Sequence, residues 1–123
     1  MSRVNMFKYE TNVMTVDPGT VIFEAGDAPD FMYVVQGGEV EIKVGEQVIE
    51  VIKAGGIFGE MALVDPEPRT ASAVARTECT LVPLNEAQFT RHIHATPFFA
   101  LQVMRIITAR LRKWMQSAPA PTA

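Results

Sequence analysis

The sequence predicts a mainly β fold, an antiparallel sandwich or barrel, that is followed by C-terminal helices. Between residues 13 and 85, short runs rich in Val, Ile, Phe and Thr alternate with turn residues, as in many all-β domains. After residue 85 the apolar residues recur with the period of a helix. The chain has 123 residues, 48% of them hydrophobic, which is enough for one domain with a real core.

Seven runs are predicted as strands. In residues 39–44 apolar and charged side chains alternate strictly, and Gly45-Glu46 then predicts a tight hairpin turn. Pro83 indicates an edge strand or a bulge, because proline has no N–H to give to a sheet. The predicted strands are residues 13–16, 21–24, 31–36, 39–44, 47–52, 72–75 and 80–84.

Two helices are predicted after the strands. Asn85 can cap a short helix over residues 86–95, and Pro97 suits the first turn of a second helix that runs to about Gln116. The second helix has two apolar faces. Either both faces pack on the barrel, or one of them meets a partner helix or covers a ligand, which would favour a homodimer. The faces are Ala100, Met104, Ile107, Leu111 and Trp114, and Phe99, Val103 and Ile106. Residues 117–123 are predicted to be a disordered tail.

Charge and cysteine content narrow the class of protein. Residues 1–90 hold 14 acids and 6 bases, a balance of −8, whereas residues 91–123 hold 5 bases and no acid, which gives −3 overall. An acidic body is not typical of a general nucleic-acid binder. The five bases of residues 91–123 are interpreted as a solvated helix face or as a docking surface. Cys79 is the only cysteine, which excludes an internal disulfide. With no signal peptide or membrane span in the pattern, we expect a cytoplasmic protein.

The segment over residues 56–74 combines charged residues with glycines in apolar surroundings. Residues 60–63 can form one turn of helix after Gly59, and the N–H groups of such a turn attract anions. Arg69 is a two-pronged donor that suits a phosphate. Glu60 would be repelled by a phosphate, but its carboxylate can accept hydrogen bonds from sugar hydroxyls. The alternative is that Arg69 forms a structural ion pair with Glu60, Asp65 or Glu67.

This segment resembles the phosphate-binding cassette of the cyclic nucleotide-binding domain superfamily, to which catabolite activator protein and the regulatory subunit of protein kinase A belong. The similarity covers about residues 13–89, and residues 18–42 resemble the first strands of that fold. The cassette pattern is matched by Phe58-Gly59-Glu60, Ala62-Leu63 and Arg69-Thr70-Ala71, in that order.

The resemblance implies an eight-stranded antiparallel β-roll, jelly-roll-like, over about residues 13–85, with the C-terminal helices over about residues 86–116. It implies that Glu60 accepts from the ribose 2′-hydroxyl, that Arg69 holds the cyclic phosphate, and that Thr70 touches the phosphate or the base. Backbone N–H groups near Gly59, Ala62 and Thr70 would complete the phosphate site. The expected ligand-binding residues are Phe58, Gly59, Glu60, Met61, Ala62, Arg69, Thr70 and Ala71.

Other chemistries find less support in the sequence. His92 and His94 are two residues apart in a predicted helix, on roughly opposite faces, and no third histidine exists to complete a metal site. Cys79 lies in a strand-like run and is interpreted as a buried small hydrophobe. No serine lies in a nucleophile-elbow pattern. We therefore expect no enzyme activity, no metal and no cofactor other than the ligand itself.

The sequence thus predicts a stand-alone domain over residues 1–123 that senses a cyclic nucleotide. We favour cAMP over cGMP, and we expect occupancy to be relayed through the C-terminal helices, with an unknown effector and a possible homodimer. The alternative is a ligand-free interaction module of the same fold that acts by dimerisation or protein docking. A DNA-binding regulator would need a further helix-turn-helix, and the chain contains no transmembrane segment or kinase motif.

Overall fold

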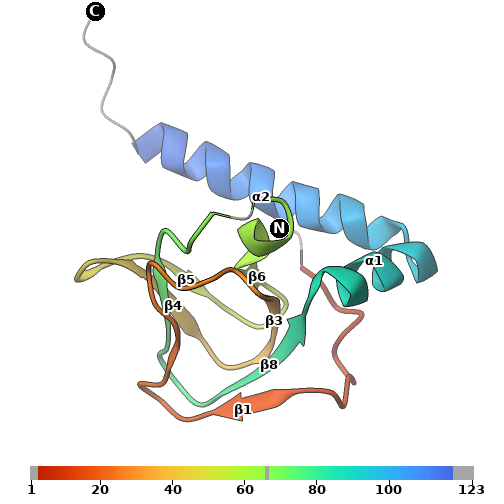
Figure 1. Cartoon of the computed structure of the whole chain (residues 1–123), viewed down its shortest axis with the longest axis horizontal. Coiled ribbons are helices and arrows are strands. Elements are labelled where there is room, and N and C mark those ends of the chain that lie inside the picture. Colours follow the sequence, from red (N-terminus) through yellow and green to blue (C-terminus); the bar gives the residue numbers. More distant parts are fainter. Residues whose placement is uncertain (1–2, 66, 118–123) are drawn as a thin grey trace, which may run out of the picture.

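The computed structural model describes residues 3–65 and 67–117. Strands come first, a 3-10 turn (η1) separates the last two strands from the others, and two helices follow (Figure 1). The elements are β1 (Met14–Val16), β2 (Val21–Phe23), β3 (Met32–Gly37), β4 (Val40–Val44), β5 (Gln47–Ile52), β6 (Ile57–Phe58), η1 (Glu60–Leu63), β7 (Ser72–Ala75), β8 (Cys79–Leu84), α1 (Glu86–Ala95) and α2 (Phe98–Ser117).

The strands form two antiparallel four-stranded sheets, in the orders β1-β8-β3-β6 and β2-β7-β4-β5. This confirms the expected eight-stranded antiparallel roll. The seven runs identified in the sequence all contain a strand. The eighth strand, β6, is only two residues long and pairs with Tyr33 and Val34 of β3. A two-residue strand is too short to show a period of two, so periodicity could not have identified it.

The turn chemistry was read correctly at one position and incompletely at another. Gly45 has φ +60° in the two-residue turn that joins β4 to β5, with Val44 opposite Gln47. Pro83, by contrast, lies in β8, which has β1 on one side and β3 on the other, so the prediction of an edge strand was wrong. Because β1 pairs only with residues 79–81, Pro83 lies where β8 has β3 as its single neighbour.

Two apolar cores flank the sheet that contains β3. Val35 and Val40 belong to the core between the two sheets, together with Phe58 and Leu81. Met32, Val34, Ile57, Val82 and Leu84 point to the opposite side of that sheet, where Phe99 and Val103 of α2 cover them. The first four residues of β3, 32–35, are therefore buried on both faces, which explains why they are all apolar.

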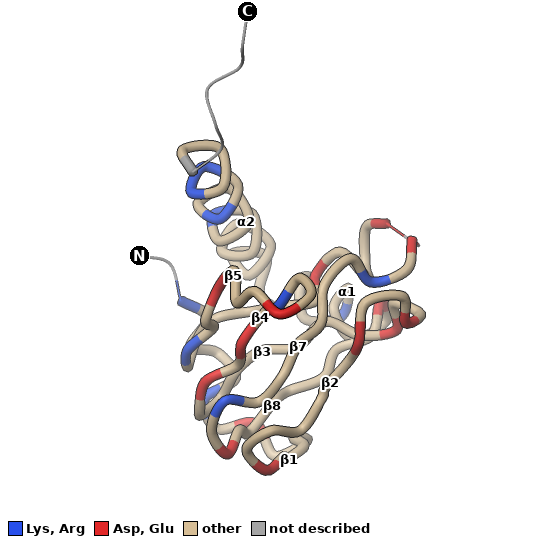
Figure 2. The backbone as a smooth tube through the Cα atoms, turned by 90° about the vertical axis from the view of Figure 1, so that its left-hand side faces the viewer, with Lys and Arg blue, Asp and Glu red and all other residues tan. Residues whose placement is uncertain are grey.

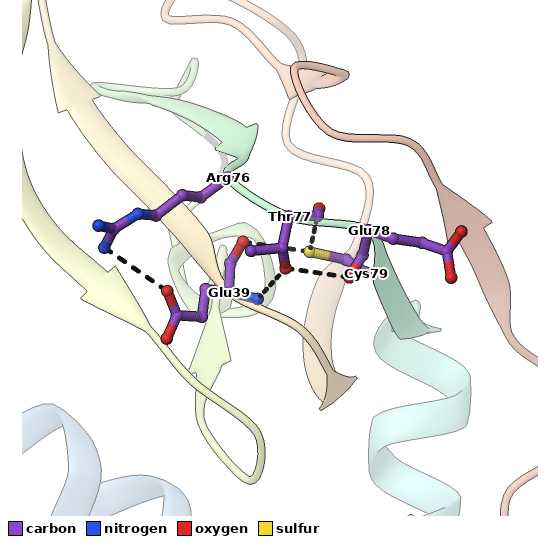
Figure 3. Close-up of polar contacts among 5 residues, drawn as sticks. All are labelled: Glu39, Arg76, Thr77, Glu78 and Cys79. Atoms are coloured by element: carbon purple, nitrogen blue, oxygen red, sulfur yellow. Dashed lines mark hydrogen bonds and ion pairs between the residues drawn. The ribbon is translucent and has the colours of Figure 1, made fainter.

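The turn between β3 and β4 packs tightly on the turn between β7 and β8 (Figure 3). Gly38 has φ +88°, and a Cβ there would lie 2.2 Å from the carbonyl oxygen of Glu78. The Glu39 amide donates to Thr77 Oγ1 at 3.0 Å, and Cys79 Sγ donates to the Glu39 carbonyl at 3.1 Å. Cys79 is fully buried, as the sequence predicted for a small hydrophobe. This junction joins one sheet to the other.

The segment before β1 packs on the helical side of the fold, which no pattern in the sequence predicted. Val4 and Phe7 are 3% and 2% exposed and belong to the core that α2 covers. Gln36 Nε2 donates to the carbonyl oxygens of Phe7 and Glu10, both at 2.9 Å. The folded unit therefore begins about ten residues earlier than the predicted roll.

The helices begin as predicted, and the structure decides which of the two predicted apolar faces of α2 packs on the roll. Asn85 and Gln88 form a reciprocal capping box at the start of α1. In α2 the residues that pack on the roll are Phe99 and Val103, with Ile106 beside them. The longer predicted stripe is largely outside the core, since Met104 and Leu111 are 56% and 53% exposed. The first half of α2 thus anchors it, and Figure 1 shows its second half extending across the roll.

The predicted disordered tail falls almost entirely outside the described residues, except for Ser117, which ends α2. None of the helices in the described part of the chain combines the length and the apolar character that crossing a bilayer requires.

Candidate ligand-binding site

A cavity of about 940 Å³ opens between the cassette, the β4–β5 hairpin and the second half of α2. Ile42 and Val44 of β4 form its apolar wall, and Glu60 and Arg69 are among its charged residues on the cassette side. The two predicted recognition residues therefore lie in one cavity and not on separate surfaces. Its volume is within the range of small-molecule sites.

Arg69 is held by the roll itself. Its guanidinium stacks on Phe23, with Cζ 4.0 Å from the ring centroid. Nη1 donates to the Gly59 carbonyl at 2.9 Å, and Nη2 donates to the Phe31 carbonyl. Nε is buried and has no hydrogen-bond partner among the described residues. A guanidinium has five N–H donors, so these contacts fix its plane and leave donors over for a ligand.

In residues 3–65 and 67–117 the Arg69 cation has no carboxylate within ion-pair distance. Among the described residues its nitrogens form no ion pair within 4.0 Å, so the alternative of a structural pair with Glu60, Asp65 or Glu67 was wrong. Burial lowers the pKa of the Arg69 guanidinium, and the nearby Tyr33 and Asp30 offset only part of this effect. A partly desolvated cation with unused donors is stabilised by an anion, and a phosphate offers the matching geometry.

Glu60 is paired with a residue of the last helix. Its Oε1 lies 2.7 Å from Nη1 of Arg110, and the two side chains are only 13% and 12% exposed. Arg110 Nη2 also donates to the carbonyl of Ile57 at 2.8 Å. Arg110 Nε lies 2.9 Å from Glu50 Oε1, in an ion pair whose angle is not that of a hydrogen bond. The Glu60 carboxylate is therefore fixed from α2, not from the roll.

The other predicted site residues all line the cavity. Phe58 is 1% exposed and stacks on Tyr33 with ring centroids 5.1 Å apart, so it supports the floor of the cavity. Met61 is 50% exposed at the rim. The Ala62 amide donates to the Gly59 carbonyl at 3.1 Å inside η1, so this predicted phosphate donor is already engaged in the structure. Gly59, Thr70 and Ala71 complete the predicted set.

Gly59 has a conformational role that its sequence context suggested. Its φ is +74°, in the left-handed region, and a Cβ there would lie 2.9 Å from Arg69 Nη1 and 3.2 Å from the Phe31 carbonyl. Any other residue at this position would thus strain the backbone and push against the guanidinium. The glycine lets η1 turn away immediately beside Arg69.

Several residues of the cavity were not identified from the sequence. Arg110, Lys113 and Trp114 reach it from α2, Glu50 reaches it from β5, and Phe23 reaches it from β2. Figure 2 shows bases along the second half of α2 and acids spread over the roll. The prediction that the bases of residues 91–123 form a solvated face or a docking surface does not hold for Arg110, which is largely buried and forms ion pairs within the chain. The sequence signal that could have pointed to Arg110 is the excess of bases in residues 91–123, in contrast to the excess of acids in residues 1–90.

The histidines lie away from the cavity. The His92 ring contacts Phe7 edge-on, with centroids 4.8 Å apart, and is partly buried, whereas His94 is exposed. Within residues 3–65 and 67–117 no three His, Cys, Asp or Glu side chains are grouped as a metal site would require.

Comparison with known proteins agrees with this geometry. Residues 13–95 match the family model of the cyclic nucleotide-binding domain, which is more than half of the chain. A cAMP-dependent protein kinase regulatory subunit from Yarrowia lipolytica is 40% identical over 78 residues, covering 62% of this chain and 21% of that protein. A CRP-like cAMP-activated global transcriptional regulator from Mycobacterium tuberculosis is 29% identical over 102 residues, covering 77% of this chain and 45% of that protein.

The fold also matches solved structures. The catabolite activator protein of Thermus thermophilus superposes with a TM-score of 0.74 at 29% identity, covering 85% of this chain and 52% of that one. The chain thus spans from about a fifth to about half of the length of these relatives. With the family model, the fold and the arrangement of the cassette in agreement, the chain belongs to the cyclic nucleotide-binding domain family.

Proposed function

We propose that the chain binds a cyclic nucleotide, cAMP in preference to cGMP, as a small sensor domain, and that α2 relays occupancy. The observation on which this rests is the cavity in which Arg69 presents unused donors at one end and Glu60 presents a fixed carboxylate at the other. A cyclic nucleotide has one phosphate charge and one ribose hydroxyl, and this pair of groups matches the ligand's two polar features.

Each predicted residue takes a separate role in this proposal. Arg69 holds the cyclic phosphate through the donors that the Gly59 and Phe31 carbonyls leave free. Glu60 accepts from the 2′-hydroxyl, because Arg110 engages its Oε1 and its second oxygen can still accept. The apolar wall from Ile42, Val44 and Trp114 receives the base. None of these roles requires a catalytic group, so we propose a binding domain and not an enzyme.

The preference for cAMP is supported by the names of relatives, whereas Thr70 is compatible with either nucleotide. The fungal kinase subunit and the mycobacterial regulator are named for cAMP, although a Toxoplasma gondii relative, 37% identical over 68 residues, is named as a cGMP-dependent kinase. Thr70 lines the cavity directly after Arg69, where its hydroxyl can meet the phosphate or the base. We place cAMP first, and cGMP is the competing ligand in the test.

Relay through α2 follows from how the helix is attached. Phe99 and Val103 anchor its first half in the core, whereas Arg110 and Trp114 in its second half line the cavity. A ligand that makes different contacts with two positions of the second half will shift the balance between them. The proposal also includes an effector protein that responds to the position of α2, and it places the chain in the cytoplasm.

A ligand-free interaction module is the second candidate, and the exposed face of α2 favours it. Phe98, Met104, Leu111 and Met115 are each more than half exposed. A homodimer through this face would bury them, and it is compatible with ligand binding as well. Sedimentation of the wild-type chain across a range of concentrations distinguishes a monomer from this dimer.

Thermal unfolding with added nucleotide separates the two candidates. A ligand that binds only the folded state at 100 times its Kd stabilises it by about 2.7 kcal/mol. We expect cAMP to raise the unfolding temperature more than cGMP does at equal concentration, and linear 5′-AMP is the control that should not. If millimolar cAMP and cGMP both leave the transition unchanged, the ligand-free module is the better description.

A further inference from the structure

Arg110 connects four elements around the sugar end of the cavity. From α2 it reaches Glu60 of η1 at 2.7 Å, Glu50 of β5 at 2.9 Å and the Ile57 carbonyl of β6 at 2.8 Å. Its side chain is 12% exposed, which is unusual for a charged side chain. A contact this buried fixes the guanidinium in one orientation.

Glu50 has no role in the cassette pattern, yet it faces the cavity. It pairs with Ile42 across the β4–β5 hairpin, and both side chains line the cavity wall. A bulge between Ile42 and Lys43 shifts the register immediately after this pair. The Glu50 side chain is 19% exposed and engages Arg110 at Nε, on the opposite side from Glu60. Two carboxylates therefore share one guanidinium.

We propose that Glu50 and Arg110 are positioning residues for Glu60, and that through it they set how strongly the site selects a ribose 2′-hydroxyl. This rests on the proposed function of cyclic nucleotide binding. Arg110 holds one Glu60 oxygen and leaves the other for the hydroxyl, and it neutralises a carboxylate that a phosphate would otherwise repel. Glu50 restrains Arg110 from the Nε side, so that the guanidinium cannot turn away from Glu60.

A purely structural role for the cluster of Glu50, Arg110 and Glu60 makes a different prediction. If Glu50 and Arg110 only tied α2 to the roll, their loss would lower stability, and it would change the affinity for all cyclic nucleotides by one common factor. If they position Glu60, their loss weakens the binding of ligands with a 2′-hydroxyl more than that of 2′-deoxy ligands. The informative quantity is therefore the ratio of the affinity for cAMP to that for 2′-deoxy-cAMP.

Isothermal calorimetry with both ligands tests the proposal. A hydrogen bond to a charged group corresponds to a preference of about tenfold or more for cAMP in the wild-type chain. We expect Arg110→Ala to reduce the preference to about threefold or less, Arg110→Lys to keep an intermediate preference, and Glu50→Gln to reduce it by at least about threefold. An unchanged preference in Glu50→Gln or in Arg110→Ala overturns the proposal.

Two control variants remove the same charges elsewhere. Glu41→Gln removes the charge of an acidic residue of β4 that does not line the cavity. Arg112→Ala removes an exposed base of α2 that does not line it either. Both should keep the wild-type preference, and a loss in either would show that net charge, not position, controls the ratio, which also overturns the proposal. Glu50→Gln conserves shape on an edge strand, and thermal unfolding without ligand verifies that each variant folds.

Failure of this proposal and failure of the proposed function give different results. If the wild-type chain binds neither cAMP nor cGMP, the proposed function is wrong and the ratio has no meaning. If it binds both cAMP and 2′-deoxy-cAMP with equal affinity, cyclic nucleotide binding stands and the positioning of Glu60 for the hydroxyl is wrong.

Discussion

The two ends of the cavity are built in different ways. At one end Arg69 is held by parts of the roll, the Phe23 ring and the carbonyls of Gly59 and Phe31. At the other end Glu60 is held by Arg110 of α2, 50 residues further along the chain. The proposed phosphate end is therefore preorganised by the roll, whereas the proposed sugar end depends on where the last helix lies.

This difference assigns different tasks to the two ends. A donor fixed by backbone carbonyls cannot move without disturbing the roll, so in the proposed function it would provide affinity whatever the position of α2. A carboxylate fixed by a helix side chain reports whether that helix is docked. The sugar end is thus the point at which ligand recognition and helix position are coupled, and variants at the two ends should behave differently.

The largest effect is expected at the phosphate end. Arg69→Ala removes at least two charge-assisted hydrogen bonds to the ligand and should weaken cAMP binding by at least about 100-fold, or about 2.8 kcal/mol. Because this residue does not touch the sugar end, 2′-deoxy-cAMP should lose the same factor. Calorimetry with both ligands measures this, and Arg76→Ala, which removes an exposed arginine paired with Glu39, is the matched control. Unchanged affinity in Arg69→Ala would contradict the assignment of the phosphate end.

A smaller effect is expected when the support of Arg69 is disturbed and Arg69 itself is kept. Gly59→Ala places a Cβ 2.9 Å from Arg69 Nη1 and strains a residue with φ +74°. We expect a loss of about tenfold in affinity, the equivalent of one hydrogen bond to a charged group, and about 1–2 kcal/mol in stability.

Gly19→Ala is the control for the backbone contribution. Gly19 has φ +85°, but a Cβ there meets nothing within 4 Å. It should show a similar loss of stability in denaturant titrations and no loss of affinity. If the two glycine variants bind cAMP equally well, the guanidinium is not held as tightly as the contacts at the phosphate end indicate.

The smallest effect concerns pH and the floor beneath the phosphate end. Burial raises the pKa of Tyr33 above its ordinary value of 10.0, although Arg69 lowers it in part. A raised pKa means that the folded state holds this proton more tightly than the unfolded state. The resulting stability is fully present below pH 10 and is lost as the pH rises through the higher folded value.

The measurement is a comparison of the wild-type chain with Tyr33→Phe in denaturant titrations from pH 8 to above pH 10. We expect the wild-type chain to lose more stability over this range than the variant does, because only the wild-type chain has the Tyr33 proton to lose. Equal slopes for the two proteins would show that the Tyr33 hydroxyl is not desolvated in solution.

Much of the roll could be predicted because its strands and turns depend on residues that are close together in the sequence. Alternating residues in 39–44 and the Gly45 turn defined a hairpin that the structure contains, and Asn85 defined the start of α1. The misses have physical reasons. Strand β6 is too short to show a period, and Pro83 lies in a central strand whose neighbour ends before it. The sequence left open which apolar face of α2 packs on the roll. Phe99 and Val103 do so, a choice that depends on which residues of the sheet face outward.

The sequence by itself determined the strand pattern, the turns and the order of the cassette residues, because each of these depends on neighbours a few positions apart. Only the tertiary structure decided that Arg69 rests on backbone carbonyls, that Glu60 is paired with Arg110 and that Glu50 joins them. These contacts link residues from different elements, and they depend on how far α2 extends across the roll and at what angle. No local pattern encodes that geometry, since it is set by the packing of Phe99 and Val103 on the far side of the sheet.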